Sequence, residues 1–246
     1  MSDNISQFER VQKLLAANAA ENIPPVTTMD DIASVTFLDF STIDFDPDYL
    51  DTLCLFHNLK SLAICIHAED LSFLSSFPQL EDLDLVCWNK RNCVDFKYFA
   101  CLKELSYLYV SGGDISSIAY WNLDALIEQK HLRDLRLHEF GEVDLAPLAK
   151  MPWIESFFCG YADRVIHPEA IGQISGLKEL ELVDFEVDNL DFLDQLDSDL
   201  SLDLCAIRSK DIFRPEQVKR FRKVDISEST FADHDWVNYQ KAEPIS

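Results

Sequence analysis

The sequence predicts an α/β solenoid: a right-handed superhelix with about nine short parallel strands on its concave face and short helices or 3-10 turns on its convex face. A six-residue pattern of apolar, two variable, apolar, one variable and apolar positions recurs through most of the chain. Between the copies lie returning segments of about two helical turns. Apolar residues make up 48% of the chain, which is enough for a continuous core.

Nine copies of the pattern occur between residues 32 and 226, and their fourth residues are separated by 27, 21, 25, 27, 22, 23, 22 and 22 positions. The fourth and sixth residues of each copy point the same way from a strand, because strand side chains alternate. One copy cannot bury that apolar edge, whereas stacked copies share one core. The copies are IASVTF (32–37), LKSLAI (59–64), LEDLDL (80–85), LSYLYV (105–110), LRDLRL (132–137), IESFFC (154–159), LKELEL (177–182), DLSLDL (199–204) and FRKVDI (221–226).

The returning segments should form the convex face. Several start with an acidic residue that can cap the exposed N–H groups of a short helix. Pro147 and Pro168 suit the first turn of such helices. The segment 112–131 has room for a true helix, and residues 38–58 form another long return.

The ends of the array should be capped, because terminal repeats need a polar outer face. We expect residues 1–31 to form an N-terminal helical cap, with a helix over 2–20 that ends at Pro24-Pro25. The competing interpretation is an amphipathic helix that binds a partner. We expect the solenoid over 32–228 and a C-terminal cap with a frayed end over 229–246.

The strand copies resemble the LxxLxL core of leucine-rich repeats, and VDLAPLAKMPWIESF (143–157) resembles the internalin-like and other bacterial repeats of that family. The resemblance covers about residues 32–228 and implies a fold without naming a function. The family usually places Asn or Cys three residues after the last strand leucine, to bond the turn backbone. Here that polar ladder is missing, so we expect an irregular solenoid whose turns are fixed by apolar packing. The positions are His67, Trp88, Gly113, Phe140, Ala162, Phe185, Ile207 and Ser229.

The charge and cysteine content limit the partners and the compartment. A formal charge of −23 repels phosphate backbones and anionic lipid. A basic protein partner, or a charge that only keeps the chain soluble, fits better than nucleic acid. Seven cysteines without a CxxC pair, no signal-peptide pattern and no long apolar run favour the cytoplasm.

No motif points to catalysis, a metal or a cofactor. Asp44, Asp46 and Asp48 resemble the opening of a calcium loop, but Tyr49 and Leu55 stand where glycine and glutamate are needed. We interpret this stretch as a solvated acidic loop. We predict a protein that is not an enzyme, although a site assembled from distant residues stays an alternative.

Two oppositely charged blocks follow each other near the C-terminus. Residues 184–203 hold eight acids and no lysine or arginine, and residues 208–223 hold seven bases and two acids. Successive repeats are neighbours in a solenoid, so we expect the blocks to lie side by side and attract. A nucleic-acid patch is the less favoured alternative, since the whole chain is acidic.

The third, fifth and seventh residues of each copy should line the concave face. In the first copy these are Ser34, Thr36 and Leu38. Aromatic and basic residues fill the middle, and acids flank them. Tyrosine and arginine are enriched at binding hot spots, whereas the alternative role is cross-strand packing without a ligand. The predicted partner-binding residues are Tyr107, Tyr109, Arg136, His138, Phe158, Asp82, Asp84, Asp134, Glu179 and Glu181.

These features predict a non-catalytic protein-interaction module that binds a partner on its concave face, and a basic partner fits the charge. A neutraliser or adaptor fits the acidic charge, and the immunity partner of a bacterial toxin is one concrete version. An enzyme or enzyme-regulatory subunit with a site on a long return loop is the alternative. An adaptor arm like those of ubiquitin-ligase substrate receptors is a third possibility.

Overall fold

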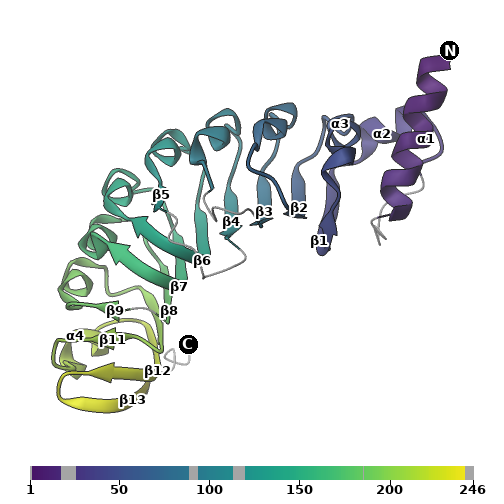
Figure 1. Ribbon diagram of the computed structural model, residues 1–246. Helices are drawn as coiled ribbons and strands as arrows, with labels where there is room; N and C mark the ends of the chain where they lie inside the picture. The colour runs from purple at the N-terminus through teal and green to yellow at the C-terminus, as the bar shows by residue number, and fades with distance from the viewer. Residues whose placement is uncertain (1, 18–25, 89–93, 113–119, 185, 242–246) are drawn as a thin grey trace.

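The computed structural model describes residues 2–17, 26–88, 94–112, 120–184 and 186–241. The chain forms a curved solenoid with its strands on the inner side of the arc and its short turns on the outer side (Figure 1). Nine parallel strands line the concave face. They are β1 (Phe37–Phe45), β2 (Ser61–Ile66), β3 (Asp82–Cys87), β4 (Tyr107–Ser111), β6 (Asp134–Asp144), β7 (Ser156–Ile166), β8 (Glu179–Val183), β10 (Ser201–Cys205) and β12 (Lys223–Phe231).

The register confirms the repeat pattern for eight of the nine copies. The fourth residues pair along the sheet, as in Leu83 with Leu108 and Leu135 with Phe157. Each of these side chains is at most 1% exposed. The strand alternation therefore buries the apolar positions that the sequence pattern assigns to the core.

The first copy was wrong by three residues. Leu62 pairs with Leu38, not with Val35, and Ser61 pairs with Phe37. The segment VTFLDF (35–40) also fits the apolar pattern, and the short helix α2 (Met29–Ser34) occupies the residues just before it. The first concave positions are consequently Phe37 and Asp39 instead of Ser34, Thr36 and Leu38, and Leu38 is fully buried.

The convex face consists mainly of 3-10 helices. An Asp or Asn side chain before most of them accepts a hydrogen bond from a backbone N–H two residues on; Asp70 Oδ1, for example, lies 2.8 Å from the Ser72 nitrogen. This confirms the expected acidic caps. The helices are η1 (Pro47–Tyr49), η2 (Ser72–Ser76), η3 (Phe96–Cys101), η4 (Asp124–Glu128), η5 (Ala146–Lys150), η6 (Pro168–Gln173) and η7 (Asp191–Gln195).

The true helix expected within 112–131 is wrong for the described part of that segment. Strand β5 (Tyr120–Asn122) pairs with β6, and only η4 follows it. The pairing uses three of the residues that a longer helix would need. The residues after β5 form only a short 3-10 helix, whose i→i+3 hydrogen bonds are typical of brief segments.

The lateral side of the solenoid holds two separate groups of paired strands. The C-terminal halves of β6 and β7 pair with each other as far as Asp144 and Ile166, and β5 joins them. Strands β9 (Glu186–Val187) and β11 (Arg208–Ser209) pair with each other, and β11 also pairs with the end of β12. No ladder joins β7 to β9 among the described residues.

The turns lack a polar ladder over most of their length, as expected. Phe140 and Ile207 are fully buried and Ala162 is nearly so, whereas Trp88 is exposed. Ser229 in the last repeat is the exception, because its hydroxyl accepts a hydrogen bond from the Ile207 nitrogen at 3.1 Å. Gly113 and Phe185 lie outside the described residues.

Helices cover the N-terminal end and a hairpin covers the C-terminal end. Helix α1 (Ser2–Ala17) buries Val11 and Leu14 and packs near α3 (Leu50–Leu53). Pro24 and Pro25 lie outside the described residues. After α4 (Pro215–Lys219) and β12, strand β13 (His234–Lys241) pairs with β12 antiparallel.

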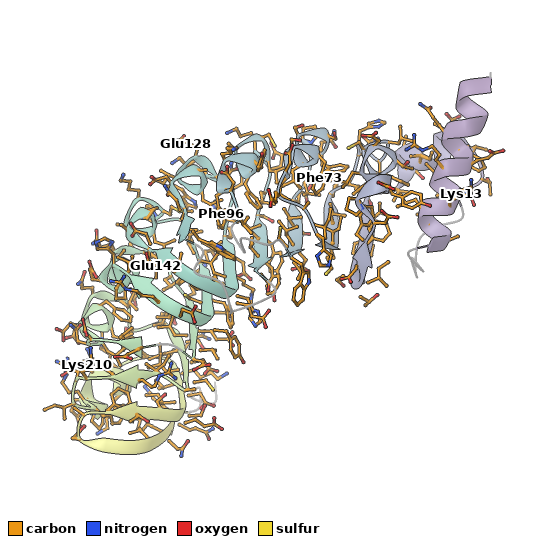
Figure 2. The ribbon with its side chains drawn as sticks, viewed as in Figure 1. Lys13, Phe73, Phe96, Glu128, Glu142 and Lys210 are labelled. Carbon is orange, nitrogen blue, oxygen red and sulfur yellow. The ribbon has the colours of Figure 1, made fainter. Side chains whose placement is uncertain are left out.

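The core is one continuous layer between the strands and the convex turns. Figure 2 shows Phe73 and Phe96 inside this layer and Glu128 on the outer side of the arc. Trp121 from β5 packs against Phe96 and Phe140. Cys159 is fully buried, as its strand position predicted. No described helix is long and apolar enough to cross a membrane.

Candidate partner-binding surface on the concave face

An aromatic row crosses the middle of the concave face. Tyr109, His138 and Phe158 come from the adjacent strands β4, β6 and β7, because successive copies, 27 and 22 residues apart, place one of them on each strand. The His138 ring centroid lies 5.9 Å from that of Tyr109 and 5.9 Å from that of Phe158. The structure thus brings together three of the aromatic residues that the sequence predicted for this surface.

Tyr161 belongs to the same group, although the strand pattern did not predict it. Its ring centroid lies 4.8 Å from that of His138, and its side chain is 38% exposed. We call Tyr107, Tyr109, His138, Phe158 and Tyr161 the central aromatic cluster.

A left-handed residue explains why Tyr161 reaches this face. In the last five repeats the eighth residue has a positive φ, between 49° and 57°, and none of these residues is buried. In the second and third repeats the eighth residue, Ile66 or Cys87, has no positive φ and points into the core. The backbone reversal therefore turns the eighth side chain outward. The five residues are Glu139, Tyr161, Asp184, Ala206 and Glu228.

Phe158 lies on the concave side as predicted, but it is only 8% exposed. Its ring lies across Gly160, where a Cβ atom would come within 2.7 Å of the ring Cζ. Its ring also stacks on His138 of the next strand, so Phe158 does pack across the strands of the sheet. Its neighbours Tyr109 and Tyr161 present more of their surface to solvent.

Arg136 links the aromatic cluster to the surrounding acids. Its guanidinium lies 5.8 Å from the Phe158 ring centroid, within cation–π range. Its Nε is 3.3 Å from Asp134 and its Nη1 is 3.9 Å from Glu181. Arg136 thus forms ion pairs with two carboxylates, one on strand β6 and one on strand β8.

Tyr107 connects the cluster to the acids on the other side. Its hydroxyl donates to Asp84 Oδ1 at 3.1 Å. Burial, followed by the nearby Asp84 carboxylate, raises the pKa of Tyr107 well above its ordinary value. Tyr107 therefore stays a neutral donor.

Few cationic side chains lie close to the carboxylates of the concave face. Burial raises the pKa of Asp84, Asp134, Glu181 and Asp203, and neighbouring acids raise it further in each case. Asp82 and Glu179 lie beside them and are exposed. Acids therefore flank the aromatic cluster on both sides, as the strand pattern predicted.

His138 is held in its neutral form. Burial lowers its pKa, although the Glu139 carboxylate 3.6 Å from Nδ1 acts in the opposite direction. Glu139 also accepts a hydrogen bond from the Ser111 hydroxyl at 3.1 Å. Glu139 was missed in the sequence for the same reason as Tyr161, since both occupy left-handed eighth positions.

The two charged blocks near the C-terminus lie side by side, as expected. Arg208 is 2.8 Å from Asp184, Lys210 is 2.9 Å from Asp188 and Arg214 is 2.5 Å from Asp191. In the stretch interpreted as a solvated acidic loop, Asp46 caps a short helix, because it accepts a hydrogen bond from the Asp48 nitrogen at the start of η1. Among the described residues, no three His, Cys, Asp or Glu side chains gather closely enough to hold a metal ion.

Comparison with solved structures shows the leucine-rich-repeat fold, and internalins are among the similar chains. The functional domain of InlJ from Listeria monocytogenes has a TM-score of 0.60 at 19% identity, covering 90% of this chain and 47% of that one. Internalin C2 from the same organism has a TM-score of 0.52 at 14% identity, covering 80% of this chain and 91% of that one. The plant peptide hormone receptor RGFR1, solved with RGF2, has a TM-score of 0.54 at 16% identity over 73% of this chain and 30% of that one. No family profile and no curated protein matches the sequence.

Proposed function

We propose that the chain is a non-catalytic interaction module that binds a protein partner on its concave face. The observation that carries this proposal is the central aromatic cluster with under-neutralised acids on both sides. Aromatic and arginine side chains dominate binding energy when a partner excludes water from them. The acids would recognise a partner whose rim is basic.

The fold supports binding as the general activity. The plant receptor RGFR1 was solved with RGF2, and the mouse RP105 chain was solved in complex with MD-1. The TLR13 structure holds a single-stranded RNA, but the −23 charge of this chain opposes a phosphate backbone. A protein or peptide is therefore the partner class we propose.

Within this class, a neutraliser or adaptor for a basic protein fits the charge best. Opposite charges speed encounter and fix orientation, and they make association depend on salt. We also propose a cytoplasmic location. Five of the described cysteines are free thiols, which suits a reducing compartment; they are Cys54, Cys65, Cys101, Cys159 and Cys205.

The test is capture of partners by the immobilised chain from a lysate of the native organism, followed by mass spectrometry and titration of the purified partner. The triple variant Tyr107→Ala, Tyr109→Ala, Phe158→Ala should lose capture while its far-UV circular dichroism stays native. A matched triple variant of exposed residues outside the site, Lys103→Ala, Glu104→Ala, Glu128→Ala, should bind as the unchanged chain does. Full affinity in the concave variant would overturn the proposal. An affinity that does not change from low to high salt would remove the basic partner.

A further inference from the structure

A hollow of about 200 Å³ lies on the concave face, next to the central aromatic cluster on its C-terminal side. The hollow exists because two of the residues that line it are serines, whose side chains are small. Ser156 on β7 and Ser201 on β10 both pair with Glu179 on β8, so the glutamate has a small side chain on each side. We call this space the serine hollow.

The next row of the sheet forms an aromatic and acidic wall. Phe158 pairs with Glu181, and Glu181 pairs with Asp203. Arg136 stands at the β6 end of the hollow and Lys223 at the β12 end. The hollow thus has an aromatic ring, two hydroxyl groups and three carboxylates within one short stretch of sheet.

The three carboxylates are poorly neutralised by the chain itself. Among the described residues, the one cation within 4 Å of any of them is Arg136, which is 3.9 Å from Glu181. Lys223 influences Asp203 through space without a close ion pair. Burial raises the pKa of both Glu181 and Asp203, so keeping them ionised costs free energy.

Arg136 shows on this same wall how a guanidinium is recognised. It lies over the Phe158 ring and reaches toward Glu181. A guanidinium suits such a wall better than an ammonium does, because it is planar, is weakly hydrated and carries five fixed donors. A second guanidinium could bind the carboxylates and serine hydroxyls that Arg136 leaves free.

We propose that the serine hollow receives one arginine side chain of the protein partner. This inference rests on the proposed concave-face function and adds the chemistry of the anchoring residue. The arginine lies against Phe158 and donates to Glu179, Glu181 and Asp203. It replaces the missing cation beside the three carboxylates of the hollow.

The experiment uses Nα-acetyl-arginine amide as the probe and follows the full-length chain by two-dimensional NMR. Nα-acetyl-citrulline amide is the matched neutral probe, with nearly the same shape and no charge. The arginine probe should shift the amide signals of Ser156, Ser201 and Asp203 in a saturable way. The citrulline probe should bind at least about tenfold more weakly, since it lacks the charge-assisted hydrogen bonds.

Two variants locate the probe. Glu181→Gln with Asp203→Asn keeps the shape and removes two charges, and it should weaken arginine binding about tenfold or more. Ser201→Leu fills the hollow and keeps all the charges, and it should also abolish the shifts. The control Glu104→Gln with Glu128→Gln removes two exposed carboxylates outside the concave face and should change nothing.

Each outcome decides the inference. Equal binding of the two probes, or arginine shifts that survive Ser201→Leu, would overturn it, as would the absence of saturable shifts. These results would leave the proposed function intact if the triple alanine variant still lost its partner. Conversely, saturable arginine binding together with full partner capture by the triple variant would remove the concave-face function and leave the hollow as an arginine site.

Discussion

The imidazole of His138 lies nearly parallel to the ring of Phe158 on the next strand, with planes 22° apart and centroids separated by 5.9 Å. Phe158 in turn lies across Gly160, which has no Cβ atom to obstruct it. The position of the aromatic cluster therefore depends on a glycine two residues along the same strand. This dependence makes it possible to move the cluster without removing any of its members.

Gly160→Ala should displace the Phe158 ring. The new Cβ atom would lie 2.7 Å from the ring Cζ and 3.2 Å from Val183 Cβ, so the ring must move. We expect the free energy of unfolding to fall by about 1–3 kcal/mol, as for other overpacked sites. Partner affinity should fall with it, because the ring leaves its place beside His138. Urea denaturation and titration of the partner measure the two effects.

The control for this variant is Ser227→Ala, which changes the seventh residue of the last repeat without crowding a ring. Unchanged stability and affinity in Gly160→Ala would show that the ring can relax at no cost. The aromatic row would then not depend on Gly160.

Removing concave charge should stabilise the free protein at neutral pH. Burial raises the pKa of Glu181 and Asp203 in the folded state, so the folded chain binds protons more readily than the unfolded chain does. Stability from these groups is fully present below their ordinary pKa and is lost as the pH rises through the raised values. Glu181→Gln with Asp203→Asn should therefore gain about 0.5 kcal/mol at pH 7, a size typical of partly exposed charges.

The gain should disappear below about pH 4, where the carboxylates of the unchanged chain are protonated. Thermal denaturation at both pH values measures it. A variant that is less stable than the unchanged chain at pH 7 would show that these carboxylates are adequately neutralised in the fold. Such destabilising charges are expected where a surface is kept for binding and not for stability.

Most of the fold could be predicted because the repeat is periodic. Eight of nine copies had the correct register, since each fourth and sixth residue is apolar and buried together. The first copy failed because two overlapping segments, IASVTF and VTFLDF, both fit the pattern. The capped helix α2 decides between them, and a six-residue window contains no information about that helix.

The concave face was predictable where the strand is regular and not where the backbone reverses. Strand alternation placed Tyr109, Arg136 and Phe158 on the concave side. Tyr161 and Glu139 were missed because their left-handed φ turns an inward position outward. Neither residue is a glycine, so the sequence carries little local signal of a positive φ. Four of the five eighth residues from Glu139 to Glu228 are acidic or small, with Tyr161 as the exception, and this repetition is the signal that was available.

His167 should make the stability depend on pH. A hydrogen bond between its Nδ1 and Asp144, at 2.8 Å, raises its pKa above the ordinary value. The folded state then holds the proton more tightly, so the stabilisation is fully present below the ordinary histidine pKa of about 6.5 and is lost as the pH rises through the raised value. His167→Asn tests this, because asparagine tolerates the left-handed φ of 54° at this position.

The unfolding temperature of His167→Asn should be lower than that of the unchanged chain at about pH 5.5, and the two should converge at about pH 9. A difference between His167→Asn and the unchanged chain that is the same at both pH values would exclude the ion pair as its cause.

His138 gives the opposite dependence, because burial lowers its pKa and its contribution to stability is lost as the pH falls. His138→Phe should therefore reduce the loss of stability on acidification.

The ion pairs between the two charged blocks should contribute little stability, and that little should depend on salt. Asp184 pairs with Arg208 and Asp188 with Lys210, yet these side chains are between 44% and 81% exposed. Exposed pairs are typically worth ~0.2–1 kcal/mol each, and salt screens them. Asp184→Asn with Asp188→Asn should therefore lose ~1 kcal/mol in low salt and about half of that or less in 0.5 M NaCl.

Urea denaturation at the two salt concentrations measures the loss, and Glu104→Gln, an exposed acid on another repeat, should show neither effect. A loss that stays constant with salt would mean that Asp184 and Asp188 hold the lateral strands β9 and β11 by local geometry, and not by charge.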